Sequence, residues 1–257
     1  MEYTLITGAT GGLGKEFCKL YASDKHNLVL VGTSDEKLSA LKEELITTYG
    51  VDVDYISADL SKEEDLKKVF NYTTEKNYFI STLVNGAGFG DRTDFKDMDP
   101  ELQIKLVAVN CSALTYFTRV YLTDMLKHNK GHIINVGSLA GFVPGPFMAT
   151  YHASKAYVLN LGESICHEIR KTKVKLLTLC PGPFISGFVE RAKNDWTFKK
   201  IKPVSAEKIA KFAYKKSLKG KRIAIYGFTN KLTAFAPRFF TRKFVATVSA
   251  GTLKKGG

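Results

Sequence analysis

The sequence predicts a single α/β domain in which seven parallel strands form a doubly wound sheet with helices on both faces. Short segments rich in Val, Ile and Leu alternate with longer amphipathic segments between residues 2 and 227. Strands of this composition are typical of parallel sheets that are covered on both faces, and right-handed crossovers then give the double winding. The 257 residues suit one such domain, and no internal repeat or Gly/Ser-rich linker divides them.

The expected elements follow one another in regular alternation. Strands are predicted at 2–7, 27–32, 51–60, 81–88, 131–138, 173–182 and 222–227. Helices are predicted after a glycine-rich turn up to about 23, at 34–50, at 61–76, after Pro100 to about His128, at 151–171 and at 205–220. Ser34 or Asp35 and Ser205 suit helix N-caps.

The glycine-rich turn joins the first strand to the first helix, where a phosphate-binding loop belongs in such a sheet. Its sequence is TGATGGLG, at 7–14. Gly8 permits a tight turn, Gly12 lets the backbone approach a pyrophosphate, and Gly14 lets the helix pack against the strand. The helix N-terminus then offers N–H groups to the anion. Such turns also occur for structural reasons alone, so this motif by itself leaves both interpretations open.

A second motif pairs Tyr151 with Lys155 on a predicted helix. Because the two residues lie four apart, their side chains leave the same helix face. A cation within about 4–6 Å of a phenol lowers its pKa from ~10, which suits the pair to acid/base chemistry. Ser138 ends the preceding buried strand and could hold the substrate oxygen that Tyr151 protonates. Tyr-x-x-x-Lys pairs are also common on solvated helices, so the other motifs must decide.

Taken together, the motifs resemble those of the short-chain dehydrogenase/reductase family. The TGxxxGxG turn at 7–14, Asn85-Gly86-Ala87-Gly88, Asn110, Ser138, Tyr151-x-x-x-Lys155 and Pro181-Gly182 occur in the family's order and approximate spacing. The resemblance, which is nearest to general reductases with broad or lipid-like substrates, extends from residue 2 to about 227. It implies a Rossmann-type catalytic domain over 1–228 and a basic, aromatic C-terminal extension of that domain over 229–257.

The resemblance implies four catalytic residues. Tyr151 exchanges a proton with the substrate oxygen, and Ser138 hydrogen-bonds that oxygen. Lys155 lowers the pKa of Tyr151 and binds the nicotinamide ribose, while Asn110 helps to hold a water that links Lys155 to solvent. The implied activity is that of an NAD(P)(H)-dependent oxidoreductase, which moves hydride between nicotinamide and a hydrophobic carbonyl or secondary alcohol.

The implied cofactor-binding residues follow the carboxyl ends of the predicted strands. Asp59 contacts the adenine, and Ser186 bonds the carboxamide. The full implied set is Gly8, Thr10, Gly12, Leu13, Gly14, Thr33, Ser34, Asp59, Leu60, Asn85, Gly86, Ala87, Tyr151, Lys155, Pro181, Gly182, Phe184 and Ser186. The sequence implies no metal site.

The end of the second predicted strand bears on the choice of cofactor. NAD-preferring sites usually carry an acid there that bonds the ribose 2′-OH, but this chain has Thr33 and Ser34, with no acid before Asp35. Gly32 leaves room for a 2′-phosphate, which these hydroxyls and Lys15 or Lys37 could bond. NADP(H) is therefore favoured over NAD(H), although Thr33 stands where NADP-dependent relatives often carry arginine.

The positive charge is concentrated in the C-terminal quarter. Residues 197–257 carry 16 Lys/Arg and one acid, whereas residues 1–196 carry 22 basic and 24 acidic groups. The aromatic segment KLTAFAPRFFTRKFVATV at 231–248 lies within that quarter. Aromatic rings interleaved with cations suit contact with a membrane surface, or the entrance of a lipid-like substrate. They equally suit a core or subunit interface, and nucleic-acid binding is disfavoured because no recognised motif accompanies the charge.

The remaining features favour a cytoplasmic enzyme, with peripheral membrane contact as an open alternative. The four cysteines form no CxxC spacing, the first strand leaves no room for a signal peptide, and no apolar run is long enough to span a membrane. The family resemblance suggests a homo-dimer or homo-tetramer. A dinucleotide-binding regulatory or scaffold protein without turnover is the alternative from another class.

The substrate side should be apolar. The loop between Ser138 and Tyr151 contains Phe142, Val143, Pro144, Pro146 and Phe147. Phe184, Phe188 and Trp196 follow the sixth predicted strand, in what the family uses as a mobile lid. Ketosteroid, 3-oxoacyl, retinoid and xenobiotic carbonyls all remain open as substrates.

Overall fold

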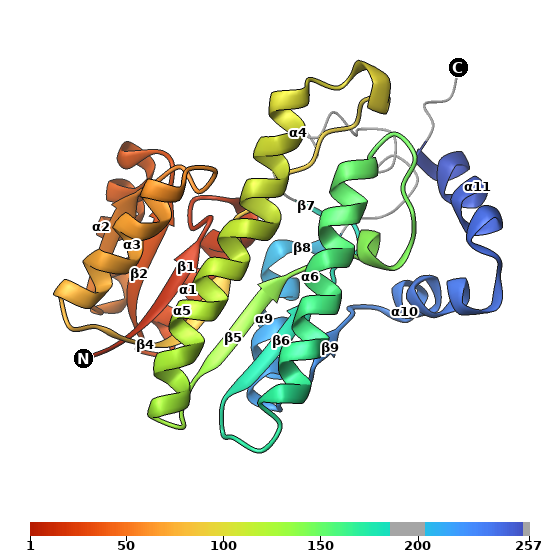
Figure 1. Ribbon diagram of the computed structural model, residues 1–257. Helices are drawn as coiled ribbons and strands as arrows, with labels where there is room; N and C mark the ends of the chain where they lie inside the picture. Colours follow the sequence, from red (N-terminus) through yellow and green to blue (C-terminus); the bar gives the residue numbers. More distant parts are fainter. Residues whose placement is uncertain (186–203, 254–257) are drawn as a thin grey trace.

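The computed structural model describes residues 1–185 and 204–253, and it confirms the seven-stranded parallel sheet (Figure 1). The strands are β1 (Glu2–Thr7), β2 (Asn27–Gly32), β3 (Val53–Ser57), β4 (Phe79–Asn85), β5 (His132–Val136), β6 (Lys175–Leu179) and β9 (Ile223–Ala224). Their order across the sheet is β3-β2-β1-β4-β5-β6-β9, and every pairing is parallel. The chain therefore winds outward in both directions, and the order reverses between β1 and β4.

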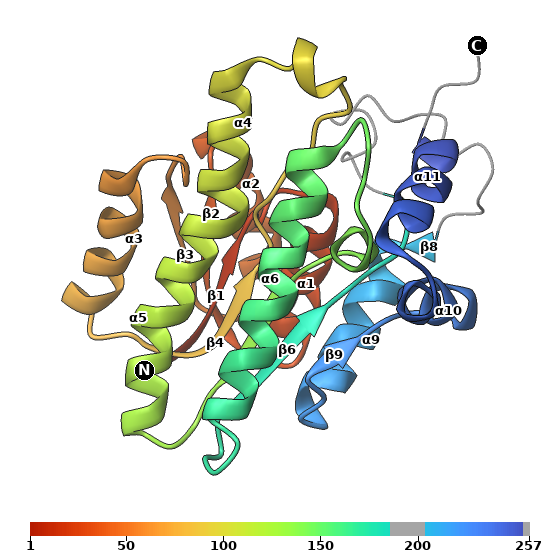
Figure 2. The same ribbon diagram turned by 45° about the vertical axis from the view of Figure 1, so that its right-hand side comes forward.

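Helices cover both faces of the sheet, as Figures 1 and 2 show. One layer contains α1 (Gly12–Ser23), α2 (Asp35–Tyr49) and α9 (Ala206–Leu218), and the other contains α3 (Glu63–Glu75), α5 (Leu114–Lys127) and α6 (Ala149–Glu168). Successive side chains of one strand point to opposite faces. Leu28 and Leu30 accordingly join the first core, while Val29 and Val31 join the second.

The helix predicted after Pro100 is one helical run with a π-helical turn inside it. The run consists of α4 (Pro100–Val107), the π turn η2 (Ala108–Ala113) and α5. Asp99 caps its start by accepting a hydrogen bond from the Glu101 N–H. A π turn adds a residue to the helix and often marks a functional site. Here it contains Asn110, which is 1% exposed.

Several predicted strands are too long at their carboxyl ends. The Ala58 N–H still bonds to the Gly32 carbonyl, but the Asp59 N–H donates to the Asp65 carboxylate instead of the sheet. The chain therefore leaves β3 three residues before the predicted end. At the edge of the sheet, β9 pairs only through Ile223 and Ala224. A further two-stranded parallel pair, β7 (Phe184–Ile185) with β8 (Val204–Ser205), was not predicted.

Close packing fixes the position of α6 on the sheet. A Cβ added to Gly162 would lie 2.0 Å from the Thr178 Oγ1 of β6, so the helix approaches that strand as nearly as a glycine allows. At the other end of the helix, a Cβ on Gly141 would lie 2.6 Å from the Lys155 carbonyl oxygen. Gly141 belongs to the short 3-10 helix η3 (Leu139–Phe142). The helix is thus held between β6 and the loop that precedes it.

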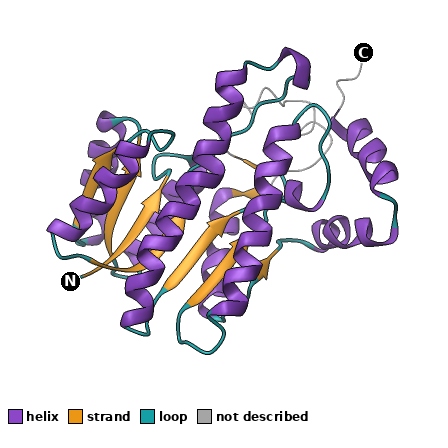
Figure 3. Ribbon diagram, viewed as in Figure 1, coloured by secondary structure: helices purple, strands orange, loops and turns teal. Residues whose placement is uncertain are grey.

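After β9 the chain forms a helical arm at the edge of the molecule (Figures 2 and 3). The arm contains α10 (Phe228–Phe235), the 3-10 helix η4 (Ala236–Phe239) and α11 (Arg242–Leu253). One side of α11 is buried through Val245, Ser249 and Leu253, at helical spacing. Within 1–185 and 204–253, no helix has both the length and the apolar character needed to cross a membrane.

Candidate active site

The site lies at the carboxyl ends of β1 and β4, where the strand order reverses and where ligands bind in sheets of this kind. Gly8 adopts φ +68°, and a Cβ there would lie 2.9 Å from the Ala87 Cα. The Thr7 hydroxyl oxygen accepts hydrogen bonds from the N–H groups of Gly86 and Ala87, both at 3.1 Å. At Gly8 the two strand ends therefore approach backbone to backbone, and the Thr7 side chain bonds them together.

The turn before α1 provides a cradle for an anion. A Cβ on Gly14 would lie only 2.0 Å from the Gly8 carbonyl oxygen, so the helix must begin immediately against the turn. The helix starts at Gly12, its N-cap Gly11 supplies no side chain, and its first turn contains no acid. By contrast, Ser34 caps α2. Uncapped N–H groups at a helix start suit a pyrophosphate, so these residues fit a dinucleotide.

The end of β2 presents hydroxyls and no carboxylate to the same region. Thr33 is exposed, and the Ser34 Oγ accepts a hydrogen bond from the Lys37 N–H at 3.3 Å. A Cβ on Gly32 would lie 3.4 Å from the Thr10 hydroxyl, so Thr10 also reaches this strand end. Lys15 and Lys37 are exposed, and neither forms a salt bridge within the described chain.

The side chain of Asp59 is already hydrogen-bonded to other residues of the protein. Its carboxylate accepts hydrogen bonds from the Ser61 N–H and hydroxyl and from Lys105 Nζ, the last at 2.9 Å. Burial tends to raise the pKa of Asp59, but these hydrogen bonds outweigh it, and the pKa lies below its ordinary value. Leu60 is 6% exposed and packs in the second core. The carboxylate of Asp59, the predicted adenine contact, is therefore held in place by Lys105 and Ser61.

The end of β4 is held from within the sheet. Asn85 is 2% exposed, and its Nδ2 donates to Thr118 Oγ1 at 3.0 Å and to Asn135 Oδ1 at 2.8 Å. Its side chain therefore joins β4 to β5 and α5. A Cβ on Gly86 would lie 2.8 Å from the Thr7 carbonyl oxygen. Glycine is therefore the residue that this tight turn admits.

The end of β6 contacts the C-terminal arm. The Pro181 carbonyl accepts a hydrogen bond from the Leu139 N–H at 3.0 Å, which joins it to η3. A Cβ on Gly182 would lie 2.5 Å from Asn230 Nδ2 of α10. Phe184 lies in β7 and packs on the first core. Ser186, Phe188 and Trp196 lie outside the described residues.

The predicted catalytic residues come together at the start of α6. Tyr151 is hydrogen-bonded to Ser138, and the Lys155 ammonium lies 5.8 Å from the centre of the Tyr151 ring. Burial raises the pKa of Tyr151 to about 12, although the hydrogen bond with Ser138 opposes the rise. The expected lowering of this pKa is therefore not seen in the protein alone, because desolvation of the phenol outweighs the other influences.

Lys155 itself is buried and lacks a carboxylate partner within the described chain. It is 5% exposed, and its Nζ donates to the Val136 carbonyl of β5 at 2.9 Å. Burial lowers its pKa from 10.5 to about 8. A Cβ on Gly88 would lie 3.5 Å from this Nζ, so the segment after β4 closes over the ammonium.

Asn110 holds two segments together through its side chain. Its Nδ2 donates to the Phe89 carbonyl at 2.9 Å and to Ser154 Oγ at 3.0 Å, while its Oδ1 accepts from the Phe89 N–H. Both Nδ2 hydrogens are thereby used. The predicted water relay from Lys155 to solvent stays a prediction, and the side chain's visible role is to fix the segment after β4 against α6.

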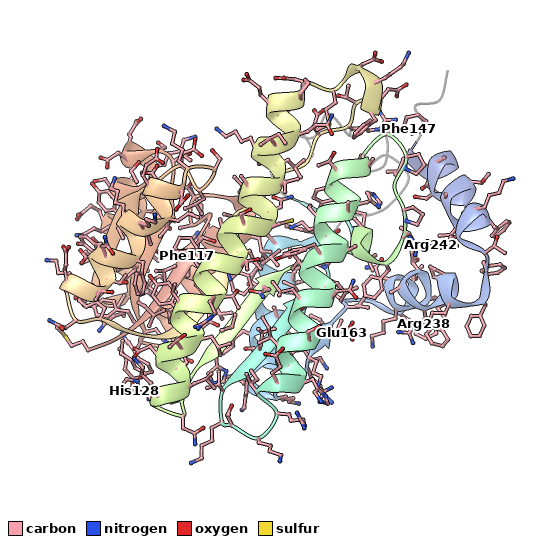
Figure 4. The ribbon with its side chains drawn as sticks, viewed as in Figure 1. Phe117, His128, Phe147, Glu163, Arg238 and Arg242 are labelled. Carbon is pink, nitrogen blue, oxygen red and sulfur yellow. The ribbon has the colours of Figure 1, made fainter. Side chains whose placement is uncertain are left out.

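Some residues around Tyr151 were not predicted from the sequence. Met148 and Leu253 form a small cluster against Tyr151 and Phe147. Phe147, which is labelled in Figure 4, adopts φ +69°, an uncommon conformation for a bulky residue. Arg92 Nε donates to the Leu253 carbonyl at 2.8 Å, which joins the segment after β4 to α11. In the sequence, Leu253 stands out only as an apolar residue at helical spacing from Val245, and nothing there indicates its contact with Tyr151.

Comparison with known proteins identifies the family. Residues 2–196 match the family model described as short chain dehydrogenase. Over 182 residues the chain is 32% identical to the 7beta-hydroxysteroid dehydrogenase of Mediterraneibacter gnavus, covering 70% of this chain and 68% of that protein. It is 30% identical over 184 residues to the very-long-chain 3-oxoacyl-CoA reductase of Anas platyrhynchos, covering 70% of this chain but only 58% of that protein.

The solved structures give the same result. A short-chain dehydrogenase from Sphingobium yanoikuyae in complex with NADPH superposes with a TM-score of 0.83 at 26% identity, covering 93% of this chain and 94% of that chain. The chain therefore belongs to the short-chain dehydrogenase/reductase family, and it is an oxidoreductase that uses a nicotinamide dinucleotide.

Lys155→Met should stabilise the folded protein. The lowered pKa means that burying this ammonium opposes folding by up to about 3 kcal/mol at pH 7. Methionine fills a similar volume without charge and loses one hydrogen bond, worth about 1 kcal/mol. Urea denaturation should show a gain of about 1–2 kcal/mol at pH 7. The gain should shrink as the pH rises from about 8 to 10.5, where the folded state has released the proton and the unfolded chain has not.

The matched control is Lys171→Met, at an exposed position in the turn after α6. It should leave the free energy of unfolding nearly unchanged. A Lys155→Met protein that is less stable than wild type at pH 7 would contradict the assignment of a destabilising buried charge.

Proposed function

We propose that the protein is a reductase that transfers hydride from NADPH to a hydrophobic carbonyl and uses Tyr151 as the proton donor. The hydrogen-bonded pair of Ser138 and Tyr151, with the Lys155 ammonium 5.8 Å from the Tyr151 ring, is the observation that supports this most strongly. The dinucleotide would supply the hydride. A phenol with a pKa of about 12 stays protonated at neutral pH, which suits an acid in the reducing direction.

The roles of the side chains follow from their positions. The hydroxyls of Ser138 and Tyr151 face one another, so a substrate oxygen placed between them can accept a hydrogen bond from each. The proton then moves from Tyr151 to that oxygen. Lys155, held by the Val136 carbonyl, lies close enough to stabilise the phenolate that remains. The surrounding Phe147, Met148 and Leu253 make this space apolar, which suits a hydrophobic substrate.

Tyr151→Phe should lower the turnover number for reduction of a hydrophobic ketone by about 10²–10⁴-fold, because it removes the general acid. Dinucleotide affinity, measured by nicotinamide fluorescence, should remain within about twofold. Tyr157→Phe is the matched control, since Tyr157 lies on the same helix, is 43% exposed and bonds Thr115. It should keep nearly full activity.

Two results would count against this role. Retained turnover in Tyr151→Phe would remove Tyr151 from the chemistry. A wild-type protein that binds the dinucleotide but reduces none of a panel of ketosteroid, 3-oxoacyl, retinoid and xenobiotic carbonyls would favour the regulatory or scaffold alternative.

NADPH is proposed as the preferred cofactor because the β2 end carries Thr33, Ser34 and the Thr10 hydroxyl, with two exposed lysines nearby and no acid before Asp35. Thr33→Asp should move the NADPH-to-NADH ratio of kcat/KM toward NADH by at least about tenfold, since a carboxylate repels the 2′-phosphate and can bond the 2′-OH. In Thr33→Asn the new side chain has the size of aspartate but no charge, so this variant should change the ratio much less. An equal shift in both variants would contradict a charge-based preference.

A membrane-associated form of this activity is a second candidate. The aromatic surface of the C-terminal arm consists of Phe228, Leu232, Phe235, Phe239, Phe240, Phe244 and Val248, which are half of the fourteen large exposed hydrophobic side chains among the described residues. Four positively charged side chains accompany it, Lys231, Arg238, Arg242 and Lys243, and no acid occurs after Glu207. Two copies meeting through this surface would oppose like charges, whereas an anionic membrane complements them.

Co-sedimentation of the full chain with phosphatidylserine/phosphatidylcholine vesicles tests this candidate. Wild type should bind these vesicles and not pure phosphatidylcholine. Phe239→Ser/Phe244→Ser and Lys231→Glu/Lys243→Glu should each weaken binding by about tenfold or more. Phe95→Ser and Lys171→Glu, at exposed positions outside the arm, should not.

Gel filtration of the same proteins tests the alternative that the aromatic surface binds a second copy of the chain. If the phenylalanine variant changes the size of the particle and wild type does not bind vesicles, the surface is an interface between copies of the chain. The expected homo-dimer or homo-tetramer stays a prediction until that measurement.

A further inference from the structure

A cavity outside the reacting site lies between the loop that follows Ser138 and the C-terminal arm. A cavity of about 200 Å³ opens there, lined by Phe142 and Pro144 of the loop and by Pro237, Arg238, Arg242 and Val245 of the arm. Its loop residues belong to the segment between Ser138 and Tyr151, which makes it a neighbour of the reacting site. We refer to it as the arginine cavity, and its two arginines are labelled in Figure 4.

The two guanidinium groups have no anionic partner among the described residues. Neither forms a salt bridge with any residue of 1–185 or 204–253, and Arg238 instead lies over the Phe235 ring at 5.5 Å. The nearest acid along the described chain is Glu207, which is already paired with Lys211. Arginine is suited to bidentate recognition of carboxylate and phosphate. Two such groups beside an apolar wall suit an amphipathic anion.

The position of Arg242 strengthens this interpretation. It is the first residue of α11, and Lys243 follows it. A cation at a helix N-terminus meets the positive end of the helix dipole, which is unfavourable. Two N–H groups of that first turn are bonded to Thr241: the Phe244 N–H donates to its Oγ1, and the Val245 N–H donates to its carbonyl. A bound anion would relieve both the paired guanidinium charges and the dipole.

Helix α11 connects this cavity to the catalytic tyrosine. Leu253, at the far end of the helix, belongs to the cluster with Tyr151, and Arg92 holds its carbonyl. At a rise of about 1.5 Å per residue, Leu253 lies roughly 12 Å along the axis from Val245 and roughly 16 Å from Arg242. The helix therefore sets a fixed separation between the Leu253 contact with Tyr151 and Arg242, the first residue of α11.

We infer that the arginine cavity binds the anionic end of an amphipathic substrate, whose carbonyl lies about 12–16 Å away at Tyr151. A carboxylate, sulfate or phosphate group suits the two guanidinium groups, and the body of the substrate between its two ends is apolar. This inference rests on the proposed function. It narrows the substrate class from hydrophobic carbonyls to hydrophobic carbonyls with a distant negative charge.

A matched pair of substrates tests the subsite: a hydrophobic ketone with a carboxylate at the stated distance, and its methyl ester. In Arg238→Gln/Arg242→Gln, KM for the acid should rise by about tenfold or more, as expected when charge-assisted hydrogen bonds are lost. KM for the ester and kcat for both should stay within about twofold. Arg170→Gln, an exposed arginine at the other end of α6, is the control and should change neither KM.

Equal effects on acid and ester, or no effect on either, would overturn the inference. Assays without lipid vesicles keep recognition of the soluble substrate apart from binding of lipid head groups. If wild type reduces neither ketone, the proposed function fails, but calorimetric titration with the carboxylate compound still tests the subsite. Wild type should then bind it about tenfold more tightly than the double variant, and equal affinities would count against the cavity.

Discussion

The site depends on one interaction, the hydrogen bond from a buried lysine ammonium to a strand carbonyl. Lys155 donates to Val136 of β5, and it can do so because Gly162 and Gly141 allow α6 to lie directly against the sheet and the preceding loop. Burial lowers the pKa of Lys155 to about 8 and raises that of Tyr151 to about 12. The fold thus accepts an unfavourable charge beside the phenol that we propose as the proton donor.

Two other parts of the chain complete this arrangement. The switch between β1 and β4 brings uncapped helix N–H groups and glycine backbone to the sheet edge, while Asn110 in its π turn ties the segment after β4 to α6. The C-terminal arm also contacts the site. Asn230 lies against Gly182, and Leu253 packs against Tyr151. Residues about a hundred positions apart in the sequence, Tyr151 and Leu253, are thereby brought into contact.

The parallel, doubly wound sheet with helices on both faces could be predicted from hydrophobic periodicity. The grouping of Ser138, Tyr151, Lys155 and Asn110 was implied by the family resemblance of their motifs. The ends of β3 and β9 could not be predicted, since they depend on where side chains such as Asp65 capture backbone N–H groups. The raised pKa of Tyr151 was also missed, because the i, i+4 spacing reports proximity to Lys155 and says nothing of desolvation. The packing of Leu253 on Tyr151 spans about a hundred residues and leaves no local signal.

The pH dependence of single-turnover ketone reduction, followed by the loss of reduced-nicotinamide absorbance, tests the paired roles of Tyr151 and Lys155 most directly. Lys155 must be charged to stabilise the phenolate, so the rate should be steady near neutral pH. It should fall by about tenfold per pH unit once the pH exceeds about 8. A rate that stays constant well above that pH would contradict the account, because Lys155 would then be neutral while proton transfer continued unimpaired.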